Sequence, residues 1–457
     1  MNPPLDPLPC ALFPPGSRPA RQVVWALVAL APALLTLFFI CRYGVNVPHW
    51  DQWEFVALLE KAYAGKLSLA DLFSQHNEHR LFFPRLFMLP LAAVSHYNTL
   101  LEMYFGWLLL LLCSVVIFCA YRQKFGLSES TLLRFVPVTW LLFSWRQYEN
   151  LLWGWQITFF MTAFAVVLTH YLLTSSKGLD KYLFLAIGSG IVASFSNSNG
   201  LLVWPIGLLQ IWTRDQRVQS DSKSSSRLNA SVWVLTAACV CLLYFIDYTK
   251  PQNHPSLLHV VTAPFSSLRY LLAVLGSPLG FKRGTAIAAG LLLTAVGILA
   301  YCIEIKKSSK LTISFWDSLV LFALLSGLML AVGRSGFGAG QALASRYTTF
   351  TILGIVALYI KSWEVFSARG RLNRAVRVTF LCLIVQGLGV SFFHGAKKAK
   401  STRVSRQTAV HLLTEPATQD DKQLAKFLYP DPQRVRQLAP FLATHKLSVF
   451  SQGEALH

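Results

Sequence analysis

Long apolar runs separated by short polar segments make up most of the chain between residues 23 and 394. A helix needs about 17–25 predominantly apolar residues to cross a bilayer. Eleven runs are suitable for such helices, namely 23–41, 99–121, 131–145, 154–174, 180–196, 200–213, 229–248, 284–304, 315–333, 347–361 and 376–394. The pattern predicts an all-α, polytopic integral membrane protein.

Two further apolar segments, 82–95 and 264–281, are interrupted by prolines and an arginine. Lys and Arg gather in five connections, 121–134, 175–181, 213–229, 305–314 and 361–377. Since cytoplasmic loops carry an excess of these residues, the connections and the N-terminus belong on the cytoplasmic side. That is possible only if the two interrupted segments do not cross. We therefore expect interfacial or re-entrant helices there, on the outer face, and a C-terminus outside.

These runs divide the chain into three parts. They are a Pro-rich cytoplasmic segment (1–22), a transmembrane domain with an outward loop at 42–98 (23–394), and a small C-terminal tail (395–457). The first run has no cleavage pattern after it, so it reads as an uncleaved signal anchor. The tail contains two patterns typical of short amphipathic helices, at 419–428 and 432–443. Basic residues at the start of the tail argue for the opposite side of the membrane.

The composition supports a membrane protein and narrows its partners. Of 457 residues, 54% are hydrophobic and 14% are charged, whereas soluble domains are about 25% charged. The formal net charge is +20, but the basic residues form short clusters between apolar runs. Such clusters are typical of topology signals and of contact with the lipid bilayer, so we expect no nucleic-acid partner. The cysteines lie mostly in apolar runs without a CxxC pair, which indicates neither a disulfide nor a zinc framework.

The outward loop is unusually polar at residues 49–54, where two acidic side chains stand among tryptophans. Asp51 and Glu54 are three residues apart, and hence lie on one face if the segment is helical. The tryptophans would anchor that helix at the membrane interface. Ionisable groups at a membrane face are costly to hold in place, so these carboxylates are candidates for function.

A second polar stretch of the loop covers residues 75–80. Ser68 begins a capping-box pattern, which predicts a short helix that reaches this stretch. On such a helix His76 would lie three residues from His79 and four from Arg80, with Glu78 between them.

Several chemistries fit the two stretches together. A carboxylate can act as general base toward a hydroxyl acceptor. A divalent metal such as Mg or Mn could be held by acidic and histidine side chains, with Asp51, Glu54, His76 and His79 as candidates. Arg80 could neutralise a phosphate. The alternative is an interfacial loop whose charges merely pair with one another.

Tryptophans and amides alternate in the connection after the third run. The candidates there are Gln147, Glu149, Asn150, Trp153, Trp155 and Gln156. Aromatic faces pack on the apolar faces of sugars, and amides bond to hydroxyl groups, so this segment could bind a sugar. An ordinary interfacial aromatic belt is the alternative.

Two later connections add further polar candidates. Asn199 lies in a short polar turn that could contact a ligand or serve only as a turn. The glycine-rich loop 333–340 is flanked by Arg334 and Arg346 and followed by Tyr347. Its flexible backbone could close over a lipid-linked phosphate, or it could be a simple connection. Because all these connections fall on the outer face, we expect them to form one outward-facing cavity.

This arrangement resembles the GT-C class of membrane glycosyltransferases, best over residues 23–120. Those enzymes have many spanning helices, a first outward loop with short membrane-surface helices and an acidic residue, and a polyprenyl-phosphate sugar donor. Here an anchor helix leads to Asp51 and Glu54, then to the segment His76–Pro84 and an embedded helix. The chain differs in having no paired Asp-Asp or Glu-Asp motif in the loop and no His-Pro-Pro pattern after it.

The resemblance implies roles for the polar clusters. Asp51 would be the base or acceptor-activating group, with Glu54 supporting it or helping to bind a metal. The site would be shaped, or the metal ligated, by His76, Glu78 and His79. The donor phosphate would be held by Arg80, Arg334 and Arg346. The sugar or the lipid would contact Trp153, Trp155 and Gln156.

We therefore predict a glycosyltransferase of a bacterial inner membrane, with its site facing the periplasm or exterior. It would move a hexosyl or pentosyl group from a polyprenyl-phosphate donor to an envelope glycan or lipid acceptor. The alternative is a transporter or flippase of a lipid-linked or polyanionic solute, which should show ionisable residues in mid-helix or broken helices related by a repeat. A structural assembly subunit is a third possibility, and it predicts no outward cavity.

Overall fold

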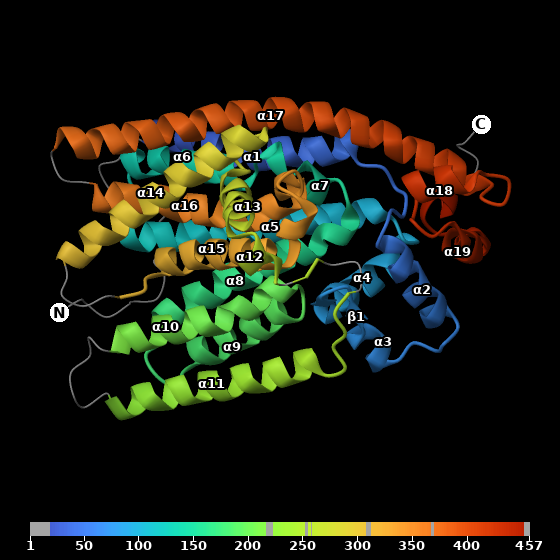
Figure 1. Ribbon diagram of the computed structural model, residues 1–457, viewed down its shortest axis with the longest axis horizontal. Helices are drawn as coiled ribbons and strands as arrows, with labels where there is room; N and C mark the ends of the chain where they lie inside the picture. The colour runs from blue at the N-terminus through green and yellow to red at the C-terminus, as the bar shows by residue number, and fades with distance from the viewer. Residues whose placement is uncertain are drawn as a thin grey trace.

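The computed structural model describes residues 19–215, 223–251, 255–256, 258–307, 312–366 and 370–451. Within these ranges the fold is almost entirely helical, with one two-stranded hairpin. Most helices run along the long axis of the molecule (Figure 1). Of the predicted N-terminal segment, residues 1–18 lie outside the described residues.

Seven described helices are long and apolar enough to cross a membrane. They are α1 (Pro19–Tyr43), α5 (Thr99–Phe125), α8 (Ile157–Ser175), α11 (Lys223–Phe245), α14 (Arg283–Lys307), α15 (Phe315–Arg334) and α17 (Arg371–Thr414). Each corresponds to one of the predicted runs, and the all-α polytopic class is confirmed.

The other four predicted spans are also helices: α6 (Glu129–Leu142), α9 (Lys181–Ser194), α10 (Val203–Asp215) and α16 (Thr348–Val365). The first three have only 14, 14 and 13 residues, or about 20 Å of helix. Helix α16 is buried on nearly every side and forms the centre of the bundle. A helix that is apolar all round belongs in such a position.

Short helices at the outer end leave room for irregular segments inside the bundle. These segments are η1 (Trp145–Gln147), α7 (Tyr148–Leu151), η2 (Gly154–Gln156), η3 (Ser198–Leu202), η5 (Ser335–Phe337), η6 (Gln341–Leu343) and η7 (Ser345–Tyr347). Except for η2, which begins the predicted run 154–174, each lies wholly or partly in a connection that the charge pattern placed on the outer face. Their convergence builds the floor of the candidate site.

The outward loop follows α1 and lies at one end of the bundle, at the right of Figure 1. It contains α2 (Gln52–Tyr63), α3 (Leu69–Phe73), β1 (Gln75–His76), β2 (His79–Arg80) and α4 (Phe82–Ser95). An anchor helix, short helices in an outward loop and then further spans form the arrangement that the GT-C resemblance implied.

The predicted helix starting at Ser68 exists, but it is shorter than expected. Ser68 and Asp71 form the capping box of α3. The chain then turns at Asn77, which has a φ of 49°, and pairs His76 with His79 in an antiparallel hairpin. The prediction of a helix through His76 was therefore wrong, because the Asn turn closes a hairpin after only two residues.

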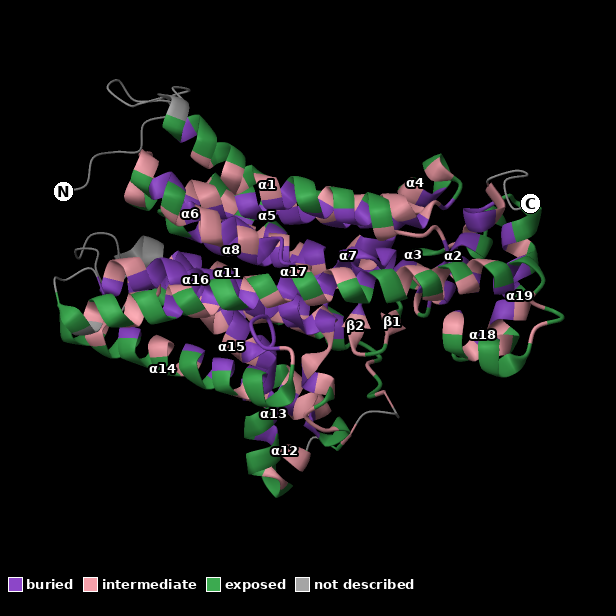
Figure 2. Cartoon of the chain, turned by 90° about the horizontal axis from the view of Figure 1, so that it is seen from above, coloured by how far each residue is buried: buried purple, intermediate pink, exposed green. Residues whose placement is uncertain are grey.

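The two interrupted segments form α4 and the pair α12 (His259–Thr262) and α13 (Pro264–Gly276). None of these helices is among the seven long spans of the described chain. Figure 2 shows α12 and α13 projecting from the side of the bundle, across the direction of the spanning helices.

Helix α17 continues well beyond the predicted end of the last span at residue 394 and carries the chain past the bundle. The expected tail helices follow as α18 (Asp421–Phe427) and α19 (Pro432–Thr444), and then η8 (Ser448–Ser451). Helix α19 packs on α2. The C-terminal end of the described chain therefore lies on the same side as the outward loop (Figure 1).

Candidate functional site

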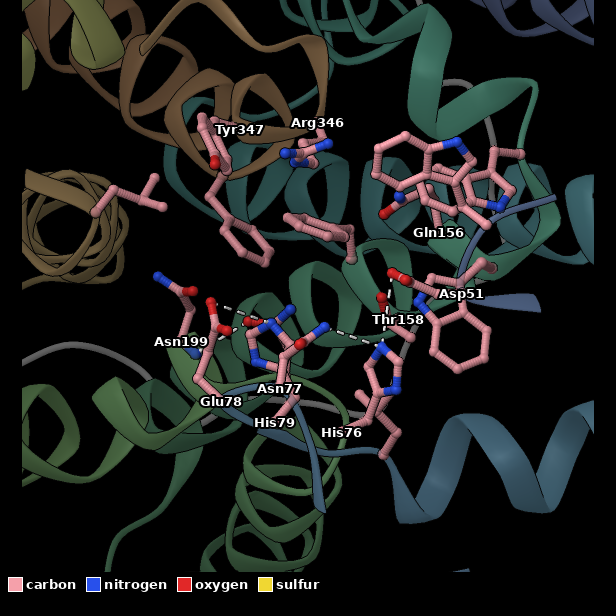
Figure 3. A pocket seen from close by; sticks show the side chains of 18 of the residues that line it. Asp51, His76, Asn77, Glu78, His79, Gln156, Thr158, Asn199, Arg346 and Tyr347 are labelled. Atoms are coloured by element: carbon pink, nitrogen blue, oxygen red, sulfur yellow. Dashed lines mark hydrogen bonds and ion pairs between the residues drawn. The ribbon is translucent and has the colours of Figure 1, made fainter. Parts of the chain in front are cut away.

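A polar cavity lies where the outward loop meets the irregular segments inside the bundle, and we call it the central cavity. It has a volume of about 220 Å³. Eleven of the residues predicted from the sequence line it, namely Asp51, His76, Glu78, His79, Trp153, Trp155, Gln156, Asn199, Arg334, Arg346 and Tyr347. Figure 3 shows side chains from the loop facing Arg346 and Tyr347 across the open space.

Asp51 stands at the N-terminus of α2, directly ahead of its first turn. Its Oδ2 lies 3.6 Å from Nε2 of His76, and its side chain is 30% exposed. The ring of His76 in turn packs edge-on against Trp155, with centroids 5.0 Å apart. The carboxylate is thus held at one side and open to the cavity, as a base that must meet a substrate hydroxyl requires.

Glu78 links the hairpin to α15 through an ion pair with Arg334. Burial by itself raises the pKa of Glu78, but the charges of His79 and Arg334 outweigh it and lower the pKa to about 2. Glu78 is therefore ionised throughout the physiological range and neutralises Arg334.

The ring of His79 is held between the loop and η3. Its Nδ1 accepts a hydrogen bond from the backbone N–H of Ser198 at 3.1 Å, and its Nε2 lies 3.7 Å from Glu78. Burial lowers the pKa of His79 to about 4, against the pull of Glu78. The ring is therefore neutral at pH 7, with its single proton on the nitrogen that faces the carboxylate.

Arg346 forms a second ion pair, with Glu149 at 3.0 Å. Burial opposes its charge, but Glu149 and Tyr347 raise the pKa of Arg346 above the usual arginine value. The guanidinium groups of Arg346 and Arg334 lie 5.4 and 5.9 Å from the centroid of the same Tyr347 ring. Two cations thus flank one aromatic side chain at the cavity wall, each with one carboxylate partner.

Three amide side chains on the cavity wall offer polar atoms to a ligand. Oε1 of Gln156 and Nδ2 of both Asn197 and Asn199 are buried and have no hydrogen-bond partner among the residues that the structure describes. Buried polar groups normally find a partner. Together with Trp153 and Trp155 they give the mixture of aromatic faces and amides that suits a hydroxylated ligand.

Sequence reasoning missed several of the lining residues. They are Trp50, Asn77, Leu81, Thr158, Phe159, Asn197, Leu330 and Phe350. Asn197 stood two residues from a predicted candidate, so the polar turn itself was a signal. Trp50 is predicted from the sequence only as an anchor at the membrane interface. Phe159, Leu330 and Phe350 carry no signal, because they look like ordinary parts of spanning helices.

Two predicted site residues of the outward loop point elsewhere. Glu54 accepts a hydrogen bond from the hydroxyl of Tyr429 in the C-terminal tail, at 2.8 Å. Arg80 is buried and donates to the carbonyls of Tyr244, Ile246 and Phe73. Adjacent residues of a strand project to opposite sides, so His79 faces the cavity while Arg80 faces α11.

Gln147 and Asn150 brace the cavity wall from behind. Gln147 accepts a hydrogen bond from the hydroxyl of Thr349 at 2.8 Å. Asn150 donates to the same hydroxyl at 2.7 Å and to the carbonyl of Arg346 at 3.0 Å. Both side chains are buried, and they hold the segment that carries Arg346.

The predicted metal ligands do not gather into one cluster. Among the described residues, no three His, Cys, Asp or Glu side chains are placed to hold a metal ion together. Asp51 and His76 form a pair, whereas Glu54 turns to the tail. A bound Mg or Mn stays a prediction.

An apolar groove adjoins the central cavity and has a volume of about 540 Å³. Its walls come from the outer ends of α11 and α15 and from η3, and include Tyr244, Phe245, Leu328 and Met329. The groove and the cavity share four residues, Glu78, Asn199, Leu330 and Arg334. The ion pair between Glu78 and Arg334 therefore stands at their junction.

Known proteins show only distant similarity to this chain. No family model matches the chain. The chain is 24% identical over 230 residues to an uncharacterized protein of Archaeoglobus fulgidus. The aligned region covers 46% of this chain and 58% of that protein, so the chain spans less than two thirds of its relative. It is also similar to the crystal structure of ArnT from Cupriavidus metallidurans bound to undecaprenyl phosphate, with 12% identity, a TM-score of 0.48, and coverage of 94% of this chain and 90% of that one.

Proposed function

We propose that the protein is a membrane glycosyltransferase that moves a sugar from a polyprenyl-phosphate donor to an envelope glycan or lipid acceptor. The observation that carries this proposal is the junction of the apolar groove with the central cavity at Arg334. A lipid-linked sugar has the same three parts in the same order: a long apolar chain, an anionic phosphate and a polar sugar.

The donor would place its polyprenyl chain in the groove and its phosphate between Arg334 and Arg346. Arginine binds phosphate through two parallel N–H donors, which makes it well suited to this position. Because Glu78 and Glu149 already neutralise these arginines, the phosphate would take over N–H donors that the carboxylates hold. The sugar would then lie against Trp153 and Trp155 with its hydroxyl groups near the unpaired amides.

Transfer would proceed by attack of an acceptor hydroxyl on the anomeric carbon of the donor sugar. Asp51 would take the hydroxyl proton as the new carbon–oxygen bond forms. The bond between the anomeric carbon and the phosphate oxygen breaks, and its electron pair leaves with the polyprenyl phosphate. The two arginines stabilise the negative charge that develops on that oxygen. Positioning in a narrow cavity supplies the rest.

A divalent metal would find two protein ligands at most in this arrangement, Asp51 and His76. A Mg or Mn ion would then need further oxygen ligands, which the donor phosphate could provide. We place the protein in a bacterial inner membrane with the cavity toward the periplasm, because the basic connections mark the opposite end as cytoplasmic.

The test is sugar transfer in proteoliposomes supplied with a panel of undecaprenyl-phosphate-linked sugars and envelope lipid acceptors. The variant Asp51→Asn keeps the size of the side chain and removes the base, so transfer should fall by about 10²–10⁴-fold. Asp71→Asn is the matched control, since it changes a carboxylate of the same loop that caps α3 outside the cavity.

Unchanged transfer by Asp51→Asn would remove Asp51 from the mechanism. Movement of a labelled lipid across the bilayer without any transfer would instead support the flippase alternative. The central cavity favours the enzyme and transporter alternatives, because the alternative of a structural assembly subunit predicts no such cavity.

A further inference from the structure

The part of the C-terminal tail that follows α17, residues 415–451, contacts the outward loop at the residues that surround Asp51. The backbone N–H of Trp50 donates to the carbonyl of Leu428 at 2.7 Å. Nδ1 of His49 lies 3.0 Å from the carbonyl of Phe427. Two consecutive loop residues are thus bound to two consecutive carbonyls of the tail, immediately ahead of the proposed base.

The backbone at this contact has an uncommon conformation. Trp50 has a φ of 47°, in the left-handed region that a bulky side chain rarely adopts. Such a conformation is strained and persists only where the surroundings impose it. Here the bond to Leu428 fixes Trp50 from the tail, while Nε1 of Trp153 donates to the carbonyl of His49 at 3.1 Å from the bundle.

The protonation of His49 supports the same contact. Burial, and then the charge of Arg406, hold the pKa of His49 well below its usual value. The ring is therefore neutral at pH 7, and its Nδ1 can donate its single proton to the Phe427 carbonyl. The tail thus meets a neutral donor that needs no counter-ion.

On the other side of Asp51 the tail holds the first turn of α2. The hydroxyl of Tyr429 donates to Glu54 at 2.8 Å, and Arg434 lies 3.8 Å from the same carboxylate. Burial, and then the bond to Glu54, raise the pKa of Tyr429, so the hydroxyl keeps its proton.

We propose that the tail contributes a positioning residue to the site. Tyr429 acts through Glu54 to hold Asp51 toward the central cavity. The catalytic part of this inference rests on the proposed function of Asp51. The mechanical part, the coupling of the tail to the segment around Trp50, stands on the contacts alone. Of the two roles that the resemblance implied for Glu54, this proposal keeps the support of Asp51 and gives Glu54 a partner in the tail.

Hydrogen–deuterium exchange of the full-length protein tests the coupling without any substrate. Tyr429→Phe removes the donor and Glu54→Met removes the acceptor of the same bond, and either can stand in if the other folds poorly. We expect amide exchange in peptides covering residues 45–56 to rise roughly tenfold in both variants, which corresponds to the loss of one such bond. The double variant should show no further rise, because the bond can be lost only once.

Tyr63→Phe is the matched control, because Tyr63 also lies on α2 and contacts rings of the tail, Phe441 and His445, at 5.5 and 4.8 Å. It should leave exchange around Trp50 as in the wild type. Exchange that is unchanged in both Tyr429→Phe and Glu54→Met, or raised equally in the control, overturns the proposal.

Turnover supplies the second readout. With undecaprenyl-phosphate-linked sugar as donor, Tyr429→Phe should lower kcat about tenfold and leave the donor KM within about twofold, because the phosphate arginines are untouched. A shift in KM alone would contradict a role through Asp51. If exchange responds as expected but the wild type transfers no sugar, the coupling holds and the proposed function fails.

Discussion

The protein buries charged side chains at both ends of its helix bundle, and the two ends use them differently. At the end away from the outward loop, Lys361 bonds to both oxygens of Glu304 at 2.8 Å and to Asp317 at 2.5 Å. At the central cavity, Arg334 and Arg346 each pair with a single glutamate. The Lys361 side chain is 6% exposed, whereas those of Arg334 and Arg346 are 18% and 29% exposed.

This difference separates charges that hold the fold from charges that can exchange partners. A cation that is paired with two carboxylates and shielded from solvent is already neutralised, so it is not available to a further anionic ligand. A cation with one carboxylate, beside an open cavity with unpaired amides, can accept an anionic ligand at modest cost. The comparison predicts that substitutions at one end damage stability and at the other end binding.

The largest effect should come from Lys361→Met. Removing the cation leaves the carboxylates of Glu304 and Asp317 without a positive charge between them, and breaking a buried ion pair costs about 3–5 kcal/mol. We expect a clear fall in the melting temperature of the detergent-solubilised protein. Adding Glu304→Gln should recover part of the loss, because one of the two unpaired charges is then removed. If Lys361→Met is as stable as the wild type, the buried ion pairs of Lys361 do not stabilise the fold and the proposed difference between the two ends is wrong.

Arg346→Met should affect binding more than stability. We expect undecaprenyl phosphate to bind roughly 10–100-fold more weakly, which corresponds to the loss of one charge-assisted contact of about 1.5–3 kcal/mol. Titration of the purified protein with undecaprenyl phosphate in detergent measures this. Lys361→Met, at a temperature where it is folded, serves as the comparison and should bind normally. Equal weakening in both variants would mean that the phosphate does not meet Arg346.

The smallest effect concerns pH and the neutral ring of His79. Burial lowers its pKa to about 4 in the folded protein, from an ordinary histidine value of about 6.5. Between about pH 6.5 and pH 4, His79 is therefore protonated in the unfolded chain but stays neutral in the folded protein. The free energy of unfolding falls as the pH drops through this range. His79→Asn keeps an acceptor for the Ser198 N–H and has no such titration. Its melting temperature should fall less between pH 7 and pH 5, and an identical slope in both proteins would contradict the burial of a neutral ring.

The outward-facing cluster could be predicted in part from the chain. The positive charges between apolar runs grouped the polar connections on one face, and that grouping brought Asp51, His79, Asn199, Arg334 and Arg346 into one prediction. Periodicity failed where a turn intervened. Asn77 closes a hairpin, so neighbouring residues of the strand split between the cavity and α11.

Contacts between distant parts of the chain could not be predicted. Glu54 and Tyr429 are 375 residues apart. The sequence around each residue gives no indication that the two side chains form a hydrogen bond. Gln147 and Asn150 read as sugar contacts because they follow a tryptophan, yet their partners lie on the segment around Arg346 and on Thr349. Only packing decides which polar side chain faces a cavity and which one fills the wall behind it.

The sequence by itself determined that this is a helical membrane protein with its polar connections gathered on one face. The length of an apolar run and the placement of Lys and Arg between runs are local properties, and the bilayer acts on them directly. The tertiary structure decided which of those polar residues form a site. Short helices leave room for the connections, a hairpin turns His79 toward the cavity, and a tail from the far end of the chain bonds to residues on both sides of Asp51. Each of these depends on contacts over long sequence separations, which no local pattern contains.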